Sequence, residues 1–213
     1  MTDTTFGAAT RTLGDYVNHD RVVVRFAALW LLCATCFTLA WYVAYQALPA
    51  GLLRGGSASL LPEYAGSLTA EFLTILAWNL GFGLVVVAAN TFRSVRTPMG
   101  YLVVLVSWVQ GAVVWGTDSL AISAGRLAPS LSVALGRSGL YELTAFVAIA
   151  VATRGVMLWH QPTTPRWSVE FDRVRSPRDW TLSRREAVAL AGGLLLLAAA
   201  NYREALMIRA AVG

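Results

Sequence analysis

Long apolar runs separated by short polar segments are the feature that most constrains this chain. A helix needs roughly 20 apolar residues to cross about 30 Å of hydrocarbon at about 1.5 Å per residue, and five charge-poor runs approach that length. Apolar residues make up 56% of the 213 residues and charged residues only 14%. The polar remainder is too short for an independent catalytic domain. The sequence therefore predicts a single integral membrane domain, an all-α polytopic bundle of about five transmembrane helices.

The predicted helices follow the apolar runs. A moderately apolar stretch at 119–137 predicts either a helix lying at the membrane interface or a re-entrant segment, and both alternatives stay open. Ser183 and Glu186 have the spacing of a capping box, which predicts a helix start beside them. The five spans are predicted at residues 26–48, 72–91, 99–117, 139–160 and 187–204, with a basic cytoplasmic loop at 161–185.

Arginine supplies all 17 basic residues, and its distribution predicts the orientation of the chain. Most arginines lie before the first span, between the second and third, and between the fourth and fifth. By the positive-inside rule these segments are cytoplasmic, which predicts a cell-membrane protein with a cytoplasmic N-terminus and an external C-terminus. The same rule accounts for the net charge of +5, so we do not expect a nucleic-acid partner. We expect the basic loop to rest on lipid headgroups or to dock a cytoplasmic partner.

Polar and small residues recur within the predicted helices at intervals of eleven. Eleven residues return to almost the same face of a helix, about 20° away. We expect this polar seam to face the interior of the bundle, where polar groups find partners. Small-xxx-small spacing, as in Ala148 with Ala152 and Ala189 with Gly193, predicts close helix packing. The seam pairs Asn79 with Asn90, Ser107 with Asp118 across Gly111, Glu142 with Thr153, and Gly193 with Glu204.

Four acidic residues fall at ends of predicted helices on the external side, namely Glu71, Asp118, Glu142 and Glu204. One interpretation is that they are interfacial charges at helix ends, with Glu142 favoured in its first turn by the helix dipole. The other is an external vestibule that binds an ion, a proton or a substrate group. As the partner of the Glu142 carboxyl group the sequence offers Arg203, Asn79 and Gln110.

Several chemical motifs are discounted. Cys33 and Cys36 form a CxxC spacing in the middle of a span, where a thiolate is disfavoured, so we interpret them as packing residues. The two histidines, His19 and His160, fall in different segments, which argues against a zinc site. The sequence has no Gly-rich phosphate loop with its lysine, no GxSxG and no HExxH. We therefore predict no catalytic residue, no metal and no cofactor.

Short motifs in this chain resemble the stage II sporulation protein M family. FLTILAWN, residues 72–79, is similar to an apolar family helix that reaches an asparagine. SGLYELTA, residues 138–145, resembles the family signature His-Gly-x-x-Glu-x-x-Ala, with Ser138 in place of the histidine. LLLLAAANYREAL, residues 194–206, is like the family's final Ala-Ala and Glu pattern. The residues that carry the resemblance are Asn79, Gln110, Gly111, Gly139, Glu142, Ala145 and Glu204.

This resemblance implies an integral membrane protein without established chemistry, which in spore formers works in an engulfment complex with cell-wall-degrading and other membrane partners. We therefore expect a non-enzymatic, partner-binding subunit of a membrane complex, in contact with the bilayer and with a membrane-protein partner or a second copy of itself. The alternative is a transporter or permease subunit with a polar path lined by Asn79, Gln110, Asp118 and Glu142. Without a clear internal repeat, such a path needs a dimer or a second subunit.

Overall fold

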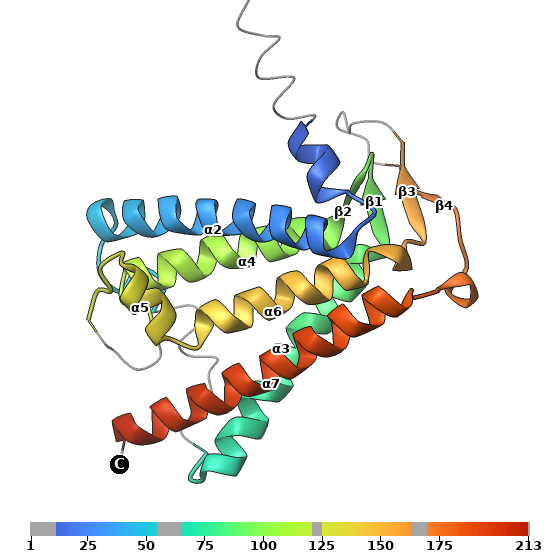
Figure 1. Cartoon of the computed structure of the whole chain (residues 1–213). Coiled ribbons are helices and arrows are strands. Elements are labelled where there is room, and N and C mark those ends of the chain that lie inside the picture. The colour runs from blue at the N-terminus through green and yellow to red at the C-terminus, as the bar shows by residue number, and fades with distance from the viewer. Residues whose placement is uncertain (1–11, 55–64, 121–124, 163–169, 213) are drawn as a thin grey trace, which may run out of the picture.

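The computed structural model describes residues 12–54, 65–120, 125–162 and 170–212. The chain is mostly helical, as predicted (Figure 1). A helical turn at 12–17 precedes the first long helix. The helices are α2 (Val22–Ala47), α3 (Leu68–Asn90), α4 (Met99–Gly116), the short α5 (Leu131–Gly136), α6 (Gly139–Ala152) and α7 (Arg184–Val212).

The long helices form one bundle. Helix α2 packs mainly against α4, and α6 packs mainly against α7, while α4 also contacts α3 and α6. Figure 1 shows α2, α4 and α6 running side by side, with α3 and α7 lying obliquely beside them. Because α4 and α6 touch, the two principal helix pairs join into one core.

Among the described residues, three helices are long and apolar enough to cross a membrane: α2, α3 and α4. Their length and composition indicate a membrane protein. Helix α6 is apolar but has only 14 residues. Helix α7 has 29 residues and carries charged side chains in its first and last turns. The predicted number of five spans therefore remains a prediction.

The fourth predicted span is wrong at its end, because α6 stops at Ala152 and not near residue 160. Thr153 caps the helix, with its backbone N–H and its hydroxyl group both donating to Ile149 O. A 3₁₀ turn, Arg154–Val156, follows, and residues 159–161 form a strand. The backbone N–H groups of Leu158 and Trp159 donate to Thr91 O. Apolar residues beyond the helix are thus used in strand pairing, which apolar composition does not distinguish from a longer helix.

A small sheet, which was not predicted, closes one end of the bundle. Its strands are β1 (Phe92–Ser94), β2 (Thr97–Pro98), β3 (Trp159–Gln161) and β4 (Asp172–Arg173), in the order β2-β1-β3-β4. Strand β1 is antiparallel to β2 and parallel to β3, and β3 is antiparallel to β4. We call this the sheet end. The opposite end, where α5 and the end of α7 lie in Figure 1, is the pocket end.

Aromatic rings and small residues hold the core together. Phe37 of α2 meets Trp108 and Trp115 of α4 edge to face, at centroid distances of 5.9 and 5.2 Å, the arrangement that aromatic quadrupoles prefer. Between α6 and α7, a Cβ atom on Gly193 would lie 2.9 Å from Ala148 Cβ. Close packing at these two small residues confirms the prediction from their spacing.

Candidate functional site

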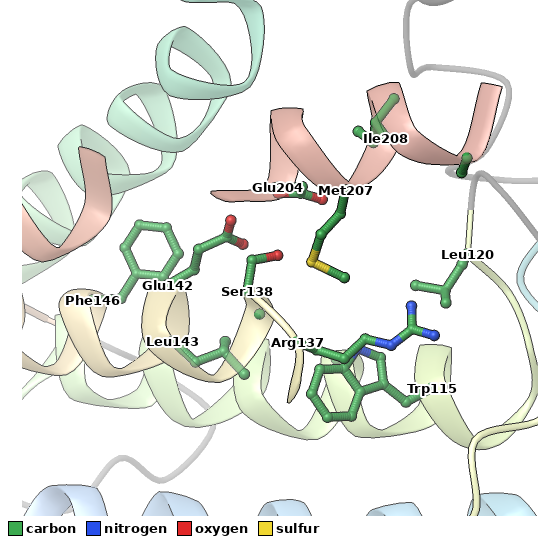
Figure 2. A pocket seen from close by; sticks show the side chains of 13 residues that line it. Trp115, Leu120, Arg137, Ser138, Glu142, Leu143, Phe146, Glu204, Met207 and Ile208 are labelled. Carbon is green, nitrogen blue, oxygen red and sulfur yellow. The ribbon is translucent and has the colours of Figure 1, made fainter. Parts of the chain in front are cut away.

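A pocket of about 490 Å³ opens at the pocket end between α4, α6 and α7. Its walls are largely apolar, and Trp115, Phe146 and Met207 are among them. Its polar lining comes from the start of α6 and from α7: Arg137, Ser138, Glu142 and Glu204 (Figure 2). The combination of apolar walls with a few polar groups is typical of ligand sites in proteins.

Two carboxyl groups meet inside this pocket. The side chains of Glu142 and Glu204 point toward each other in Figure 2 and interact directly. Glu142 Oε1 is buried and has no hydrogen-bond partner among the described residues. Two ionised carboxylates at such close range repel each other. The pair therefore requires a proton or another positive charge between the two groups.

Local sequence explains how α6 presents Glu142. The backbone N–H of Glu142 donates to Ser138 O, and the residue lies in the first turn of the helix, where the helix dipole favours an acidic side chain. At Gly139 a Cβ atom would lie 3.0 Å from the Trp115 ring, and at Gly111 it would lie 3.6 Å from Leu143. Gly139 therefore lets α6 start close against α4, whereas a side chain at Gly111 would make an ordinary van der Waals contact. Both glycines line the pocket and do not supply polar groups to it.

A positive charge also lines the pocket, on Arg137. Figure 2 shows its guanidinium group extending toward Trp115 and Leu120, away from the carboxyl pair. Within the described parts of the chain, no ion pair joins Arg137 to Glu142 or Glu204. No described basic side chain therefore neutralises the carboxyl pair.

Arg203, the first candidate partner for Glu142, binds elsewhere. Its guanidinium group donates to Leu135 O at 3.3 Å and to Gly136 O at 2.7 Å. It also lies over the Tyr141 ring, 5.3 Å from the centroid. Arg203 thus caps the last carbonyl groups of α5, which is a common use of arginine at a helix end. The prediction failed because it placed Arg203 at the correct depth without knowing on which side of α7 it lies.

The two amide candidates also lie away from Glu142. Asn79 donates from Nδ2 to Asn201 Oδ1 at 2.9 Å, joining α3 to α7. Asn90, its partner in the predicted seam, is fully buried and donates to Ala150 O and Thr153. The seam of α3 therefore faces the interior, as predicted. Gln110 is exposed and lines a separate groove between α3 and α4.

The remaining acidic candidates have local roles. Asp118 forms an ion pair with Arg54 at 2.6 Å, and Arg54 also donates to the Asp118 carbonyl oxygen. Glu71 accepts a hydrogen bond from the backbone N–H of Ala65 at 2.9 Å. These contacts favour the helix-end interpretation for Asp118 and Glu71. None of the three described pockets is lined jointly by Asn79, Gln110, Asp118 and Glu142.

Sequence reasoning placed Glu142 and Glu204 at the same depth but did not pair them. The predicted polar seam held the signal. In it, Glu142 lies on the same helix face as Thr153, and Glu204 lies on the same helix face as Gly193. Gly193 packs against α6, so the residue eleven positions later on the same face also points at α6. Combining the seam with the small-residue spacing would have found the pair.

No family model matches the chain, and no curated protein or solved structure matches it. The resemblance to the stage II sporulation protein M family therefore stays a prediction. Within the described ranges, no group of three or more His, Cys, Asp or Glu side chains is arranged to hold a metal ion. Cys33 and Cys36 are both free thiols.

Proposed function

We propose that this protein is a non-enzymatic integral membrane protein that binds a partner in a membrane complex, and that the α6–α7 pocket takes a positively charged group of that partner. The observation that carries the proposal is the Glu142–Glu204 pair, in which Glu142 Oε1 is buried and unpartnered. An ammonium or guanidinium group between the two carboxylates would remove their repulsion and form charge-assisted hydrogen bonds.

The walls of the pocket suit the side chains that bear such charges. Lysine and arginine carry their charge on a long apolar stem, which packs on apolar surface while the head meets polar groups. Trp115 and Phe146 add aromatic faces, which attract cations. A lysine or arginine side chain of a partner therefore matches both the charge and the lining of the pocket.

The proposed topology has five spans with the sheet end in the cytoplasm. Its support is the concentration of described arginines around the start of α2, between α3 and α4, and between α6 and α7, all regions that meet at the sheet end. Helix α6 would cover about 21 Å at about 1.5 Å per residue, so the bilayer would have to thin around it. The pocket and the C-terminus would then be external.

Transport is the alternative function, because a carboxyl pair that binds a cation can also be part of a path that carries cations across the membrane. The residues predicted to line a path do not meet in one of the described pockets, which supports binding over passage. In proteoliposomes, we expect Glu142→Gln to leave proton and cation flux at the level of empty vesicles, as for the wild type. A flux that depends on Glu142 would favour transport.

The binding proposal is tested on the purified full-length protein with three small probes. We expect n-butylammonium and n-butylguanidinium to raise the unfolding temperature with a saturable dose dependence, and n-butanol to leave it unchanged. Glu142→Gln should abolish the response, whereas the control Glu170→Gln, which changes an exposed carboxylate, should retain it. Equal responses in both variants, or no response in the wild type, would overturn the proposal.

A further inference from the structure

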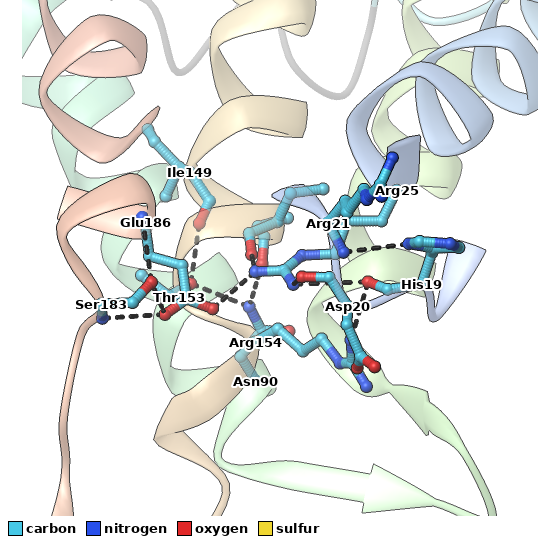
Figure 3. Close-up of polar contacts among 12 residues, drawn as sticks. His19, Asp20, Arg21, Arg25, Asn90, Ile149, Thr153, Arg154, Ser183 and Glu186 are labelled. Atoms are coloured by element: carbon cyan, nitrogen blue, oxygen red, sulfur yellow. Dashed lines mark hydrogen bonds and ion pairs between the residues drawn. The ribbon is translucent and has the colours of Figure 1, made fainter. Parts of the chain in front are cut away.

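Three arginines gather around shared carbonyl groups at the sheet end. Arg25 and Arg154 both donate to His19 O, at 3.4 and 3.1 Å, and Arg93 donates to Arg154 O at 3.2 Å. Figure 3 shows Arg25 and Arg154 converging on the turn that contains His19 and Asp20. Residues from α2, β1 and the turn after α6 thus place three guanidinium groups together.

The negative charge in this cluster does not balance the positive charge. Arg25 is paired with Glu186, whose Oε1 lies 2.5 Å from Arg25 Nη2. Neither Arg93 nor Arg154 has a carboxylate partner among the described residues. Burial, and then the neighbouring charges of Arg154 and Arg175, lower the pKa of Arg93. A bound anion would stabilise the charged form of these partly buried arginines.

Buried hydrogen-bond donors without partners lie in the same cluster. Tyr101 and Arg25 are only 2% and 3% exposed, and the Tyr101 hydroxyl group and Arg25 Nε have no partner among the described residues. The same holds for Arg93 Nε. Tyr101 lies within electrostatic range of all three arginines. Buried polar groups are almost always satisfied, so three unmet donors on residues of one charged cluster indicate a missing acceptor.

We propose that Arg25, Arg93, Arg154 and Tyr101 form a binding site for a phosphate group. Guanidinium groups present paired donors that match phosphate oxygens, and the tyrosine hydroxyl group adds a further donor. Arg93 and Arg154 are partly exposed, so solvent reaches these two residues, while Arg25 and Tyr101 lie deeper. The proposal is independent of the acidic pocket at the opposite end.

The phosphate group has two sources, which the experiment separates. The purified full-length protein, in a maltoside detergent that contains no phosphate, is titrated with inorganic phosphate at constant ionic strength set by chloride. A parallel titration uses dioctanoyl phosphatidylglycerol, with dioctanoylglycerol as the matched lipid that lacks phosphate.

The readouts are the dissociation constant and the unfolding temperature. Saturable binding of inorganic phosphate identifies a soluble ligand, and binding of the phospholipid alone identifies a lipid headgroup. Either result supports the site.

Variants test whether these residues hold the ligand. We expect Arg154→Gln and Tyr101→Phe to weaken binding at least about tenfold, which is about 1.4 kcal/mol at 25 °C. Tyr101→Phe removes a single unpartnered hydroxyl group, so the variant should still fold. Arg96→Gln is the control, because Arg96 is an exposed arginine at the same end, paired with Asp15, and it should bind as the wild type does. Binding of neither probe, or equal weakening in Arg96→Gln, would overturn the proposal.

Discussion

The two ends of the bundle hold clusters of opposite charge and are built differently. At the pocket end, Glu142 and Glu204 come from the facing sides of two packed helices. At the sheet end, Arg93 and Arg154 lie on a short strand and on a 3₁₀ turn. Helices α6 and α7 contribute to both ends. One scaffold thus holds an acidic pair and a basic cluster apart along the same helices.

Removing the buried arginine should have the largest effect on stability. Arg25→Met leaves Glu186, whose side chain is only 17% exposed, without its partner, and breaking a buried pair costs about 3 to 5 kcal/mol. Arg96→Met breaks an ion pair whose side chains are 66% and 62% exposed, and should cost about 0 to 1 kcal/mol. The free energy of unfolding in mixed micelles measures both. Similar values for the two variants would show that Arg25 does not anchor the sheet end.

The contact between α6 and α7 connects the two ends, and glycine substitutions test it. Gly193→Ala places a Cβ atom 2.9 Å from Ala148 Cβ and 3.2 Å from the Ala145 carbonyl oxygen, so we expect a loss of about 1 to 3 kcal/mol. Gly192→Ala meets nothing within 4 Å and should stabilise the helix by up to about 1 kcal/mol. Equal effects in the same unfolding assay would refute the close packing of α6 on α7.

Replacing one carboxyl group of the Glu142–Glu204 pair should change stability much less than Arg25→Met. Without a bound cation the pair holds a proton, so Glu142→Gln replaces a neutral carboxylic acid with a neutral amide, and we expect a change of less than about 1 kcal/mol at neutral pH. Glu170→Gln should change the free energy of unfolding by less than about 0.5 kcal/mol, because that carboxylate is exposed. A clear loss of stability in Glu142→Gln would mean that the carboxylate already has a partner.

The smallest expected effect is a pH dependence at the sheet end. Burial raises the pKa of Glu186, but hydrogen bonds from Ser183 and Arg25 outweigh burial, so the net pKa is lowered. Its contribution to stability is therefore complete above the ordinary glutamate pKa of about 4.3 and is lost as the pH falls through the lower folded value. The stability difference between wild type and Glu186→Gln should shrink on acidification through this window. A difference that grows instead would contradict the assignment.

Apolar runs predicted the helical elements well where the helix itself supplies the backbone hydrogen bonds. Helix α4 was predicted at 99–117 and observed at Met99–Gly116. The end of α6 was missed, because Trp159 and His160 pair with Phe92 and Arg93. These strands are only two or three residues long, and their partners are far away in the sequence. Such pairing leaves no local periodicity to detect.

The sequence predicted how far along the bundle the candidate site residues lie, but it did not predict which of them face each other. Their positions at the ends of predicted helices on the external side placed Glu142 and Glu204 near one end of the bundle, and the structure brings them together. Arg203 and Gln110 have the right depth but lie on other helix faces. The arginine distribution placed Arg25 and Arg93 on the same side of the membrane, but it did not predict their convergence with Arg154, because carbonyl groups of His19 and Arg154 hold the cluster together. Backbone acceptors are present at every position of a chain, so side-chain patterns do not reveal them.

One two-by-two binding measurement tests most directly whether the two ends are separate sites of opposite charge. Glu142→Gln and Arg154→Gln are each titrated with n-butylammonium and with the phosphate probe that binds the wild type. We expect Glu142→Gln to lose the response to n-butylammonium alone and Arg154→Gln to lose the response to phosphate alone. Loss of both responses in either variant, or of neither response in both, would contradict the separation.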